Sequence, residues 1–346
     1  MSPYGAPQVP AVAALNTNEN PYSPSPALQK AITDAVAKVA VDLNRYPDRD
    51  ATILRTKLAT YINEGNGTSF TLDNIWAANG SNEIIQSIFL AFAQGAVLGF
   101  TPSYSMHPLI AKTTGAQWID GKRNADFSLN TSDAVSEILK NKPTLTFITT
   151  PNNPTGGAVT LAEIQKLADA AKDVGGLLVV DEAYAEFSQE VSAVTLIANN
   201  PHLIVIRTMS KAFAFAGARL GYLVSDVAVK DAMMIVRLPY HLSALTQAAA
   251  QVAIDHRAEL LSGVSTLIKA RGEVVQALHD MGLTTITSSA NFVLFTGFKQ
   301  DAPQLWAALL EKGVLIRDVG LSGYLRVTIG NEAENKLFVS ALKELI

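Results

Sequence analysis

The sequence predicts an α/β fold in which a mainly parallel sheet is sandwiched by helices, followed by a smaller α+β domain. Three observations predict it. The chain has 346 residues and 48% hydrophobic content, short apolar runs alternate with helical segments between about residues 75 and 225, and further strand-like segments gather in the last third. At about 150 residues per domain, this length indicates roughly two domains.

An extended arm is expected over residues 1–25, which are rich in Pro, Asn and Ser and contain few helix-forming stretches. A large domain should follow over residues 26–252. Runs that are apolar throughout indicate strands buried on both faces of a parallel sheet. Such runs are A-V-L-G-F (96–100), T-L-T-F-I (144–148), L-L-V-V (177–180) and L-I-V-I (203–206), with helical segments between them.

A smaller α+β domain is expected over residues 253–346. The chain is helical in pattern from Ser243 to Met281, with an interruption at Ser262-Gly263. Strand-like segments follow at T-T-I-T (284–287) and N-F-V-L-F (291–295), then a helix near 303–312, a strand at L-R-V-T-I (325–329) and a terminal helix. Strands grouped with helices in this way are typical of the α+β class.

Composition excludes several classes of protein. A net charge of −4 without any run of five like charges lacks the footprint of a nucleic-acid or polybasic membrane binder. Without cysteine there is no disulfide, thiolate zinc site or cysteine nucleophile, which suits a reducing cytoplasm. The N-terminus has no secretory signal pattern. We therefore expect a cytoplasmic protein that binds small molecules and no metal.

One charge-free stretch, Ile84 to Ala111, is long enough to span a bilayer. Glycines and prolines interrupt it at positions 95, 99, 102 and 108. A buried helix, a turn and a buried strand explain this stretch better than a membrane span.

Polar residues follow three of the predicted strands. T-T-P-N-N-P-T-G (149–156), D-E-A-Y (181–184) and R-T-M-S-K (207–211) each come where an apolar run ends. In isolation, Asn153 is typical of a turn, Asp181 of a cap and Lys211 of a surface lysine. Because ligands collect at the carboxyl ends of strands in an open α/β sheet, their joint placement predicts a site.

A lysine, a carboxylate and an asparagine at one crevice fit the needs of a pyridoxal cofactor. The amine, here of Lys211, forms a Schiff base with the aldehyde, and the carboxylate, here of Asp181, keeps the pyridine nitrogen protonated. An amide or phenol near the ring oxygen stabilises its anionic form and lowers the basicity of the imine. Asn153 and Tyr184 are the candidates for that position.

The cofactor phosphate requires an anion site, and N-G-S-N-E (79–83) leads into the apolar helix Ile84 to Phe92. Free backbone amides and the helix dipole at such a start bind anions. The alternative is plain capping by Ser81 or Asn82. Near Lys211, the side chains that add hydroxyl donors and a forked cation are Thr208, Ser210 and Arg219.

A set of motifs in order along the chain resembles the histidinol-phosphate aminotransferases, which are fold type I pyridoxal-phosphate enzymes. The motifs are N-E-N-P-Y (18–22), R-Y-P-D (45–48), N-G-S-N-E, P-S-Y-S (102–105), P-N-N-P-T-G, D-E-A-Y, S-K-A-F-A-F-A-G-A-R-L-G-Y (210–222) and L-R-V-T-I-G (325–330). They extend over nearly the whole chain.

The resemblance implies that Lys211 is the catalytic, cofactor-bearing lysine, that Asp181 pairs with the pyridine nitrogen and that Asn153 and Tyr184 contact the ring oxygen. Tyr104 is the expected stacking partner of the ring. The implied phosphate ligands are Gly80, Ser81, Asn82, Thr208, Ser210 and Arg219. Tyr46 resembles the tyrosine that reaches the phosphate of the neighbouring subunit, which implies a homodimer.

The resemblance further implies histidinol phosphate and glutamate or 2-oxoglutarate as substrates, bound by Tyr22, Asn153, Arg317 and Arg326. An aromatic amino acid aminotransferase and a phosphothreonine decarboxylase are the alternatives, because an arginine near Arg326 grips an α-carboxylate in related enzymes. A pyridoxal-phosphate-binding regulator without turnover is a third. Its fused form carries an N-terminal winged-helix domain, for which the short segment before N-E-N-P-Y leaves no room.

Two features depart from the family pattern. Ala214 stands where many relatives have glycine, and only eight residues separate Arg317 from Arg326. The first concerns the loop after Lys211, and the second the loop beside the expected substrate pocket.

Overall fold

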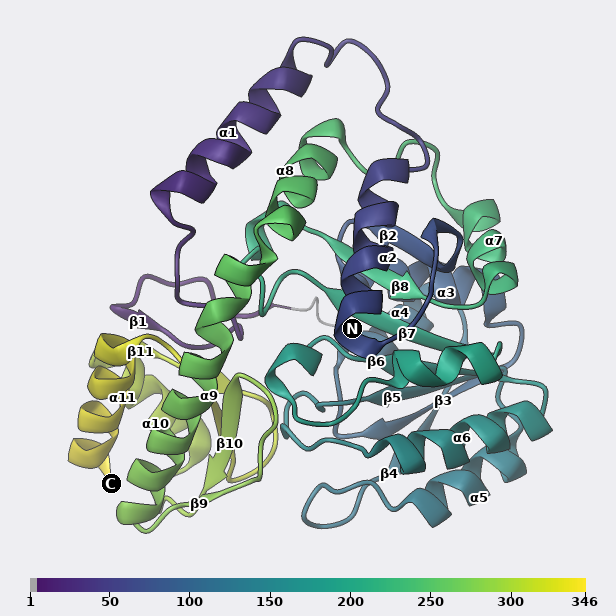
Figure 1. The fold of residues 1–346 in the computed structure, drawn as a ribbon. Coiled ribbons are helices and arrows are strands. Elements are labelled where there is room, and N and C mark those ends of the chain that lie inside the picture. Colours follow the sequence, from purple (N-terminus) through teal and green to yellow (C-terminus); the bar gives the residue numbers. More distant parts are fainter. Residues whose placement is uncertain (1–4) are drawn as a thin grey trace.

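A seven-stranded sheet forms the centre of the computed structural model, which describes residues 5–346. The strand order is β2-β8-β7-β6-β5-β3-β4, and β8 alone runs antiparallel to its neighbours. A four-stranded antiparallel sheet, β12-β13-β10-β9, lies beside it (Figure 1). The predicted fold class, an α/β protein with a mainly parallel sheet between helices, is confirmed.

The strands of the large sheet are β2 (Ile75–Ala78), β3 (Ala96–Thr101), β4 (Gln117–Lys122), β5 (Leu145–Thr149), β6 (Leu177–Asp181), β7 (Leu203–Thr208) and β8 (Gly221–Val224). Those of the small sheet are β9 (Thr284–Thr285), β10 (Phe292–Thr296), β12 (Arg317–Asp318) and β13 (Leu325–Thr328). The four apolar runs predicted as strands are confirmed, and they correspond to β3, β5, β6 and β7.

The helices are α1 (Pro26–Ala40), α2 (Thr52–Asn66), α3 (Ser81–Phe92), α4 (Met106–Thr114), α5 (Thr131–Asn141), α6 (Leu161–Asp173), α7 (Val227–Val236), α8 (Ala244–Asp255), α9 (Arg257–Asp280), α10 (Ala302–Glu311) and α11 (Glu332–Leu345). Short 3₁₀ turns occupy η1 (Leu72–Asn74), η2 (Ala185–Phe187), η3 (Ala193–Asn199) and η4 (Ala216–Ala218).

Side chains of the central strands point alternately into two apolar layers. Phe147 and Val179 pack in one layer with residues of α3, α4 and α7, while Ile148 and Val180 pack in the other with residues of α2, α6 and α8. Every residue of β5 and β7 is buried. This double coverage explains why the strands are apolar on both faces.

The uncharged stretch from Ile84 to Ala111 folds as most of α3, then β3, then the first part of α4. The expected sequence of buried helix, turn and buried strand is therefore confirmed. Within residues 5–346, no helix has the length and apolar character that crossing a bilayer requires.

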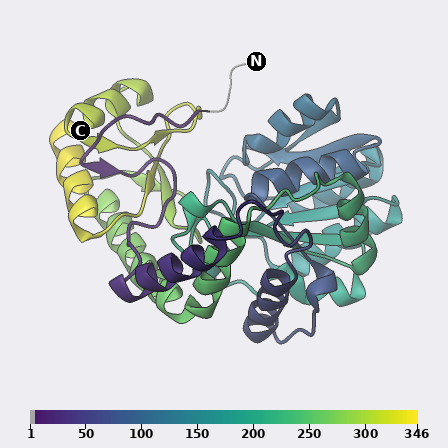
Figure 2. The same cartoon turned by 90° about the horizontal axis from the view of Figure 1, so that it is seen from above.

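The N-terminal arm contains a short strand that the sequence did not reveal. Strand β1 (Ala13–Ala14) pairs in parallel with β11 (Val314–Leu315) beside the small sheet. The arm then passes on to α1, which starts at Pro26 after a cap by Ser25 and packs along α8 (Figure 2). The first four residues of the predicted arm lie outside the described part.

The sequence placed the break in the long helical stretch at the wrong residues. Helices α8 and α9 meet at His256, whereas Ser262 and Gly263 lie inside α9. A Cβ built at Gly263 would lie 3.2 Å from Cδ2 of Tyr22. The glycine therefore makes room for the arm and does not break the helix.

Candidate active site

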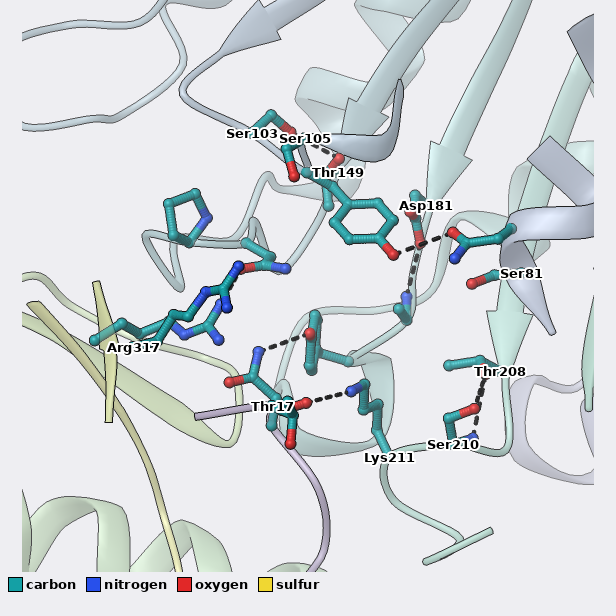
Figure 3. A pocket seen from close by; sticks show the side chains of 18 of the residues that line it. Thr17, Ser81, Ser103, Ser105, Thr149, Asp181, Thr208, Ser210, Lys211 and Arg317 are labelled. Carbon is teal, nitrogen blue, oxygen red and sulfur yellow. Dashed lines mark hydrogen bonds between the residues drawn. The ribbon is translucent and has the colours of Figure 1, made fainter. Parts of the chain in front are cut away.

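A cavity of about 200 Å³ lies at the carboxyl ends of β5, β6 and β7. The arm and the small sheet complete its wall (Figure 3). Its lining comprises Thr17, Asn18, Ser81, Asn82, Ser103, Tyr104, Ser105, Thr149, Asn153, Pro154, Asp181, Ala183, Tyr184, Thr208, Ser210, Lys211, Arg219, Arg317, Val319 and Arg326. The fold thus brings together the three polar segments that follow the apolar strands.

Lys211 extends into this cavity from the loop after β7. Its Nζ donates a hydrogen bond to the carbonyl of Thr17 at 2.8 Å (Figure 3). Burial lowers the pKa of Lys211 to about 8, and the positive charges of Arg326 and Arg219 act in the same direction, against Glu19. A lysine with a lowered pKa carries more of the neutral, nucleophilic amine near pH 7.

Asp181 ends β6 and is 2% exposed. Its Oδ1 accepts a hydrogen bond from the amide of Ala183 at 3.2 Å, and its Oδ2 lies 3.3 Å from Nε2 of the buried His107. His107 also packs edge-on against Tyr104, with ring centroids 5.5 Å apart. A carboxylate held in this way is oriented before any ligand arrives.

Asn153 and Tyr184 occupy the same cavity but are held from different sides. Oδ1 of Asn153 accepts a hydrogen bond from Arg326 of β13. The hydroxyl of Tyr184 accepts one from Nδ2 of Asn18 at 2.8 Å. Tyr184 is 4% exposed, so its ring is buried, and the hydroxyl is the one polar group of the side chain.

The start of α3 forms a cradle with Arg219. Gly80 precedes the helix with φ 85°, and a Cβ there would lie 2.6 Å from NH2 of Arg219. A Cβ at Gly221 would lie 2.5 Å from the amide nitrogen of Ser81. Both glycines therefore permit the guanidinium and β8 to approach the helix start closely.

Hydroxyl groups complete the cradle. Oγ1 of Thr208 lies 3.0 Å from Oγ of Ser210, and NH1 of Arg219 lies 3.5 Å from the same Oγ. Tyr104 donates its hydroxyl hydrogen to Oδ1 of Asn82 at 3.1 Å. Backbone amides, hydroxyls and a guanidinium together suit a phosphate dianion.

Arg317 and Arg326 lie directly opposite each other on the paired strands β12 and β13. The guanidinium of Arg326 covers the ring of Phe292 and donates to the carbonyl of Asn16 at 2.8 Å, and NH1 of Arg317 donates to the carbonyl of Gly5. Arg317 lies across the cavity from Ser81 and Thr208 (Figure 3). Like charges placed directly opposite are unfavourable, so this pair favours an anionic ligand.

Three predicted site residues do not line the cavity. Gly80 lies just before the lining residue Ser81, at the start of α3. Tyr46 is 79% exposed and stacks on Tyr240, with ring centroids 4.2 Å apart. Tyr22 is 38% exposed and packs beside Gly263. A single chain therefore does not bring either tyrosine into contact with Lys211.

The sequence reasoning missed several residues that the fold adds to the site, among them His107, Thr17 and Asn18. His107 comes three residues after Tyr104, and its amide donates to the Tyr104 carbonyl in the turn that leads into α4. Thr17 precedes the N-E-N-P-Y motif and Asn18 begins it, and only Tyr22 of that motif received a role. Their contacts join the arm to segments far away in the sequence.

Comparison with known proteins decides the family. Residues 10–342 match the sequence profile of the family described as aminotransferase class I and II.

The chain belongs to this aminotransferase family.

Two curated relatives carry the name histidinol-phosphate aminotransferase. The protein from Mycobacterium sp. (strain JLS) is 51% identical over the whole of this chain and 92% of its own length. The protein from Mycolicibacterium smegmatis is 52% identical over 99% of this chain and 91% of its own. The resemblance inferred from the motifs is confirmed.

Solved aminotransferases share the fold. Histidinol-phosphate aminotransferase from Clostridium acetobutylicum superposes with a TM-score of 0.86 at 24% identity, covering 96% of this chain and 99% of its own. The enzyme from Sinorhizobium meliloti, solved in complex with pyridoxal-5′-phosphate, superposes with a TM-score of 0.84 at 24% identity, covering 97% of this chain and 91% of its own.

Family membership makes this aminotransferase a pyridoxal-phosphate enzyme, as the sequence predicted. The residues of the cavity fit that cofactor. An amine, a carboxylate, an amide, a phenol, hydroxyl groups and a guanidinium line one space, beside the helix start at Gly80, where a Cβ would meet Arg219.

Proposed function

We propose that this aminotransferase transfers an amino group between histidinol phosphate and 2-oxoglutarate, giving imidazole-acetol phosphate and glutamate, in histidine biosynthesis. The observation that carries the proposal is the full-length similarity, at 51% and 52% identity, to relatives of that name. The facing pair of Arg317 and Arg326 supports it, because both the phosphate ester and glutamate present an anion at a distance from the reacting carbon.

The proposed roles of the cofactor-binding residues follow from their contacts. Arg219, Thr208, Ser210 and the helix start at Gly80, Ser81 and Asn82 hold the phosphate of pyridoxal phosphate, and Tyr104 stacks on its ring. Asp181 holds a proton at the pyridine nitrogen. Asn153 and Tyr184 donate to the ring oxygen. When bound, the cofactor accepts the electron pair released from the substrate α-carbon into its ring.

Lys211 then has two tasks. Its amine holds the cofactor before the substrate arrives, and once displaced it moves a proton between the substrate α-carbon and C4′ of the cofactor. The same base serves both half-reactions. Ping-pong kinetics are expected because the first product leaves before the second substrate binds. Asn153, Arg317 and Arg326 orient the substrate from the side of the small sheet.

We further propose that the molecule is a homodimer in which Tyr46 reaches the neighbouring subunit's site. Tyr46 stacks on Tyr240, and Ile235 and Leu238, a few residues before Tyr240 in the chain, are 84% and 74% exposed. Large apolar side chains gathered at a surface typically mark a protein interface. A second copy of the chain, related by a twofold axis, is the proposed partner.

Two remaining expectations are also proposals. Residues 26–252 are proposed as the large domain and 253–346 as the small one, supported by the separate sheets that they contain. A cytoplasmic location is proposed from the lack of cysteine in the sequence, which suits a reducing compartment.

The substrate proposal is tested by comparing kcat/KM for histidinol phosphate with that for phenylalanine on one preparation. We expect histidinol phosphate to be preferred at least tenfold, about 1.4 kcal/mol of transition-state discrimination. A tenfold preference for phenylalanine would instead make the chain an aromatic amino acid aminotransferase. Release of carbon dioxide from phosphothreonine would indicate the decarboxylase.

A further inference from the structure

The first residue of the N-E-N-P-Y motif, Asn18, lies in the wall of the cavity and is 2% exposed. Its backbone has φ 56°, in the left-handed region that asparagine adopts more readily than most residues. None of the roles proposed above uses it.

Every polar group of Asn18 is engaged. Its amide nitrogen donates to Oγ1 of Thr328, and the Thr328 hydroxyl donates back to Oδ1 of Asn18, both at 3.0 Å. Its carbonyl accepts from Asn291 at 3.1 Å. Its Nδ2 donates to the hydroxyl of Tyr184 at 2.8 Å. Asn18 therefore connects the small sheet to a tyrosine of the large one.

The contact with Thr328 orients the Asn18 amide. Oγ1 of Thr328 accepts from the Asn18 backbone and donates its own hydrogen to the side-chain oxygen. This leaves the Asn18 NH₂ group facing Tyr184, whose oxygen must then accept.

We propose that Asn18 is a positioning residue that acts on the cofactor's ring oxygen through Tyr184. A hydroxyl that accepts a hydrogen bond becomes a stronger donor of its own hydrogen. Tyr184 polarised in this way stabilises the ring oxyanion better and so holds the basicity of the Lys211 imine down. The proposal rests on the role proposed above for Tyr184.

Several charged groups also face Lys211. They are Arg326 from β13, Arg219 from the loop after η4, Glu19 from the arm and Asp181 from β6. Asn18 carries no charge, so its removal leaves these electrostatic contributions in place. A change in the imine pKa then reports the hydrogen bond to Tyr184.

The test is a pH titration of the visible absorbance of the holoenzyme, in the absence of substrate, for Asn18→Gly, Tyr184→Phe and the double variant. Glycine adopts the left-handed conformation without strain, so Asn18→Gly removes the side chain and keeps the backbone. We expect Asn18→Gly to raise the imine pKa by at least about half a unit. In the Tyr184→Phe background, the same change should add nothing.

The outcomes separate the two claims. If Tyr184→Phe leaves the imine pKa unchanged, the role of Tyr184 fails, and this inference fails with it. If Tyr184→Phe raises the pKa and Asn18→Gly does not, only the role of Asn18 is wrong. An equal rise from Asn18→Gly in both backgrounds would show that Asn18 acts by another route and would overturn the inference.

Asn16→Ala is the matched control on the same arm, because the Asn16 side chain donates to the carbonyl of Pro7. Its imine pKa should be unchanged, and a shift as large as that of Asn18→Gly would overturn the inference. If Asn18→Gly does not fold, Thr328→Val replaces it. Removing that hydroxyl frees the Asn18 amide to turn, so a smaller rise is expected, and no rise counts against the proposal.

Discussion

Burial and two arginines act on the amine of Lys211 in the same direction, lowering its pKa from 10.5 to about 8. In the apoenzyme, the amine should therefore become reactive as the pH rises through about 8. Trace acetylation of the apoenzyme at a series of pH values, read by mass spectrometry, measures this for each lysine. Half-maximal labelling of Lys211 near its ordinary pKa of 10.5 would contradict the assignment, and exposed Lys269 reports the reactivity of the reagent.

Ala214 has φ 51° in the loop after Lys211. The left-handed conformation costs an alanine about 1 kcal/mol, and glycine adopts it freely. We expect Ala214→Gly to raise the free energy of unfolding by about 0.5–1 kcal/mol, measured by denaturant titration of the apoenzyme. Ala212→Gly, two residues away at an ordinary φ, should lower it. A loss of stability in both variants would contradict the claim that the backbone of Ala214 is strained.

Single residues were predictable where chemistry restricts the choice. Lys211, Asp181 and Asn153 each follow an apolar strand, so the sheet topology alone brings them to one cavity. His107 was missed because a buried histidine on a helix looks like core. Its role depends on Asp181, which lies far away in the sequence, and only the fold shows that contact.

At the scale of elements, the strands were predictable because burial on both faces makes them mostly apolar. The break in the long helical stretch was less predictable. A glycine signals either a break or a close neighbour, and the sequence does not distinguish the two. At Gly263 the neighbour is Tyr22, on an arm at the opposite end of the chain.

The start of α3 should bind the cofactor phosphate only while Arg219 lies close to Gly80. Gly80→Ala places a methyl group 2.6 Å from NH2 of Arg219 and strains a φ of 85°. We expect the dissociation constant of pyridoxal phosphate to rise at least about tenfold, measured by fluorescence titration of the apoenzyme.

Gly217→Ala is the control for this change. Gly217 lies in η4, two residues before Arg219, and a Cβ there would meet no atom within 4 Å. Its cofactor affinity should stay at the wild-type value. Equal weakening in both variants would show that the loop as a whole, and not the approach of Arg219 to Gly80, determines binding.

At the scale of the whole molecule, residues of both subunits form each active site of the proposed dimer. Lys211→Ala removes the catalytic amine from one chain, and Tyr46→Ala removes the proposed partner contribution from the other. In mixed dimers, one site would contain both native residues. Mixing the two inactive proteins in equal amounts, with subunit exchange, should restore about a quarter of the wild-type activity.

Failure to restore activity would place Tyr46 in its own subunit or outside the site. The resemblance alone implied the dimer, and the residues by themselves could not predict it, for a physical reason. The exposed stack of Tyr46 on Tyr240 can contribute to a site only when the surface of a second subunit covers it. The strand-end residues, in contrast, meet within a single fold.

The central claim is that Lys211 carries the cofactor. Borohydride reduction of the holoenzyme converts the Schiff base into a stable secondary amine, and peptide mass spectrometry then identifies the modified lysine. The account predicts the pyridoxyl group on the peptide that contains Lys211, and its loss from the Lys211→Ala variant. A pyridoxyl group on a different lysine of the wild-type protein would contradict the account.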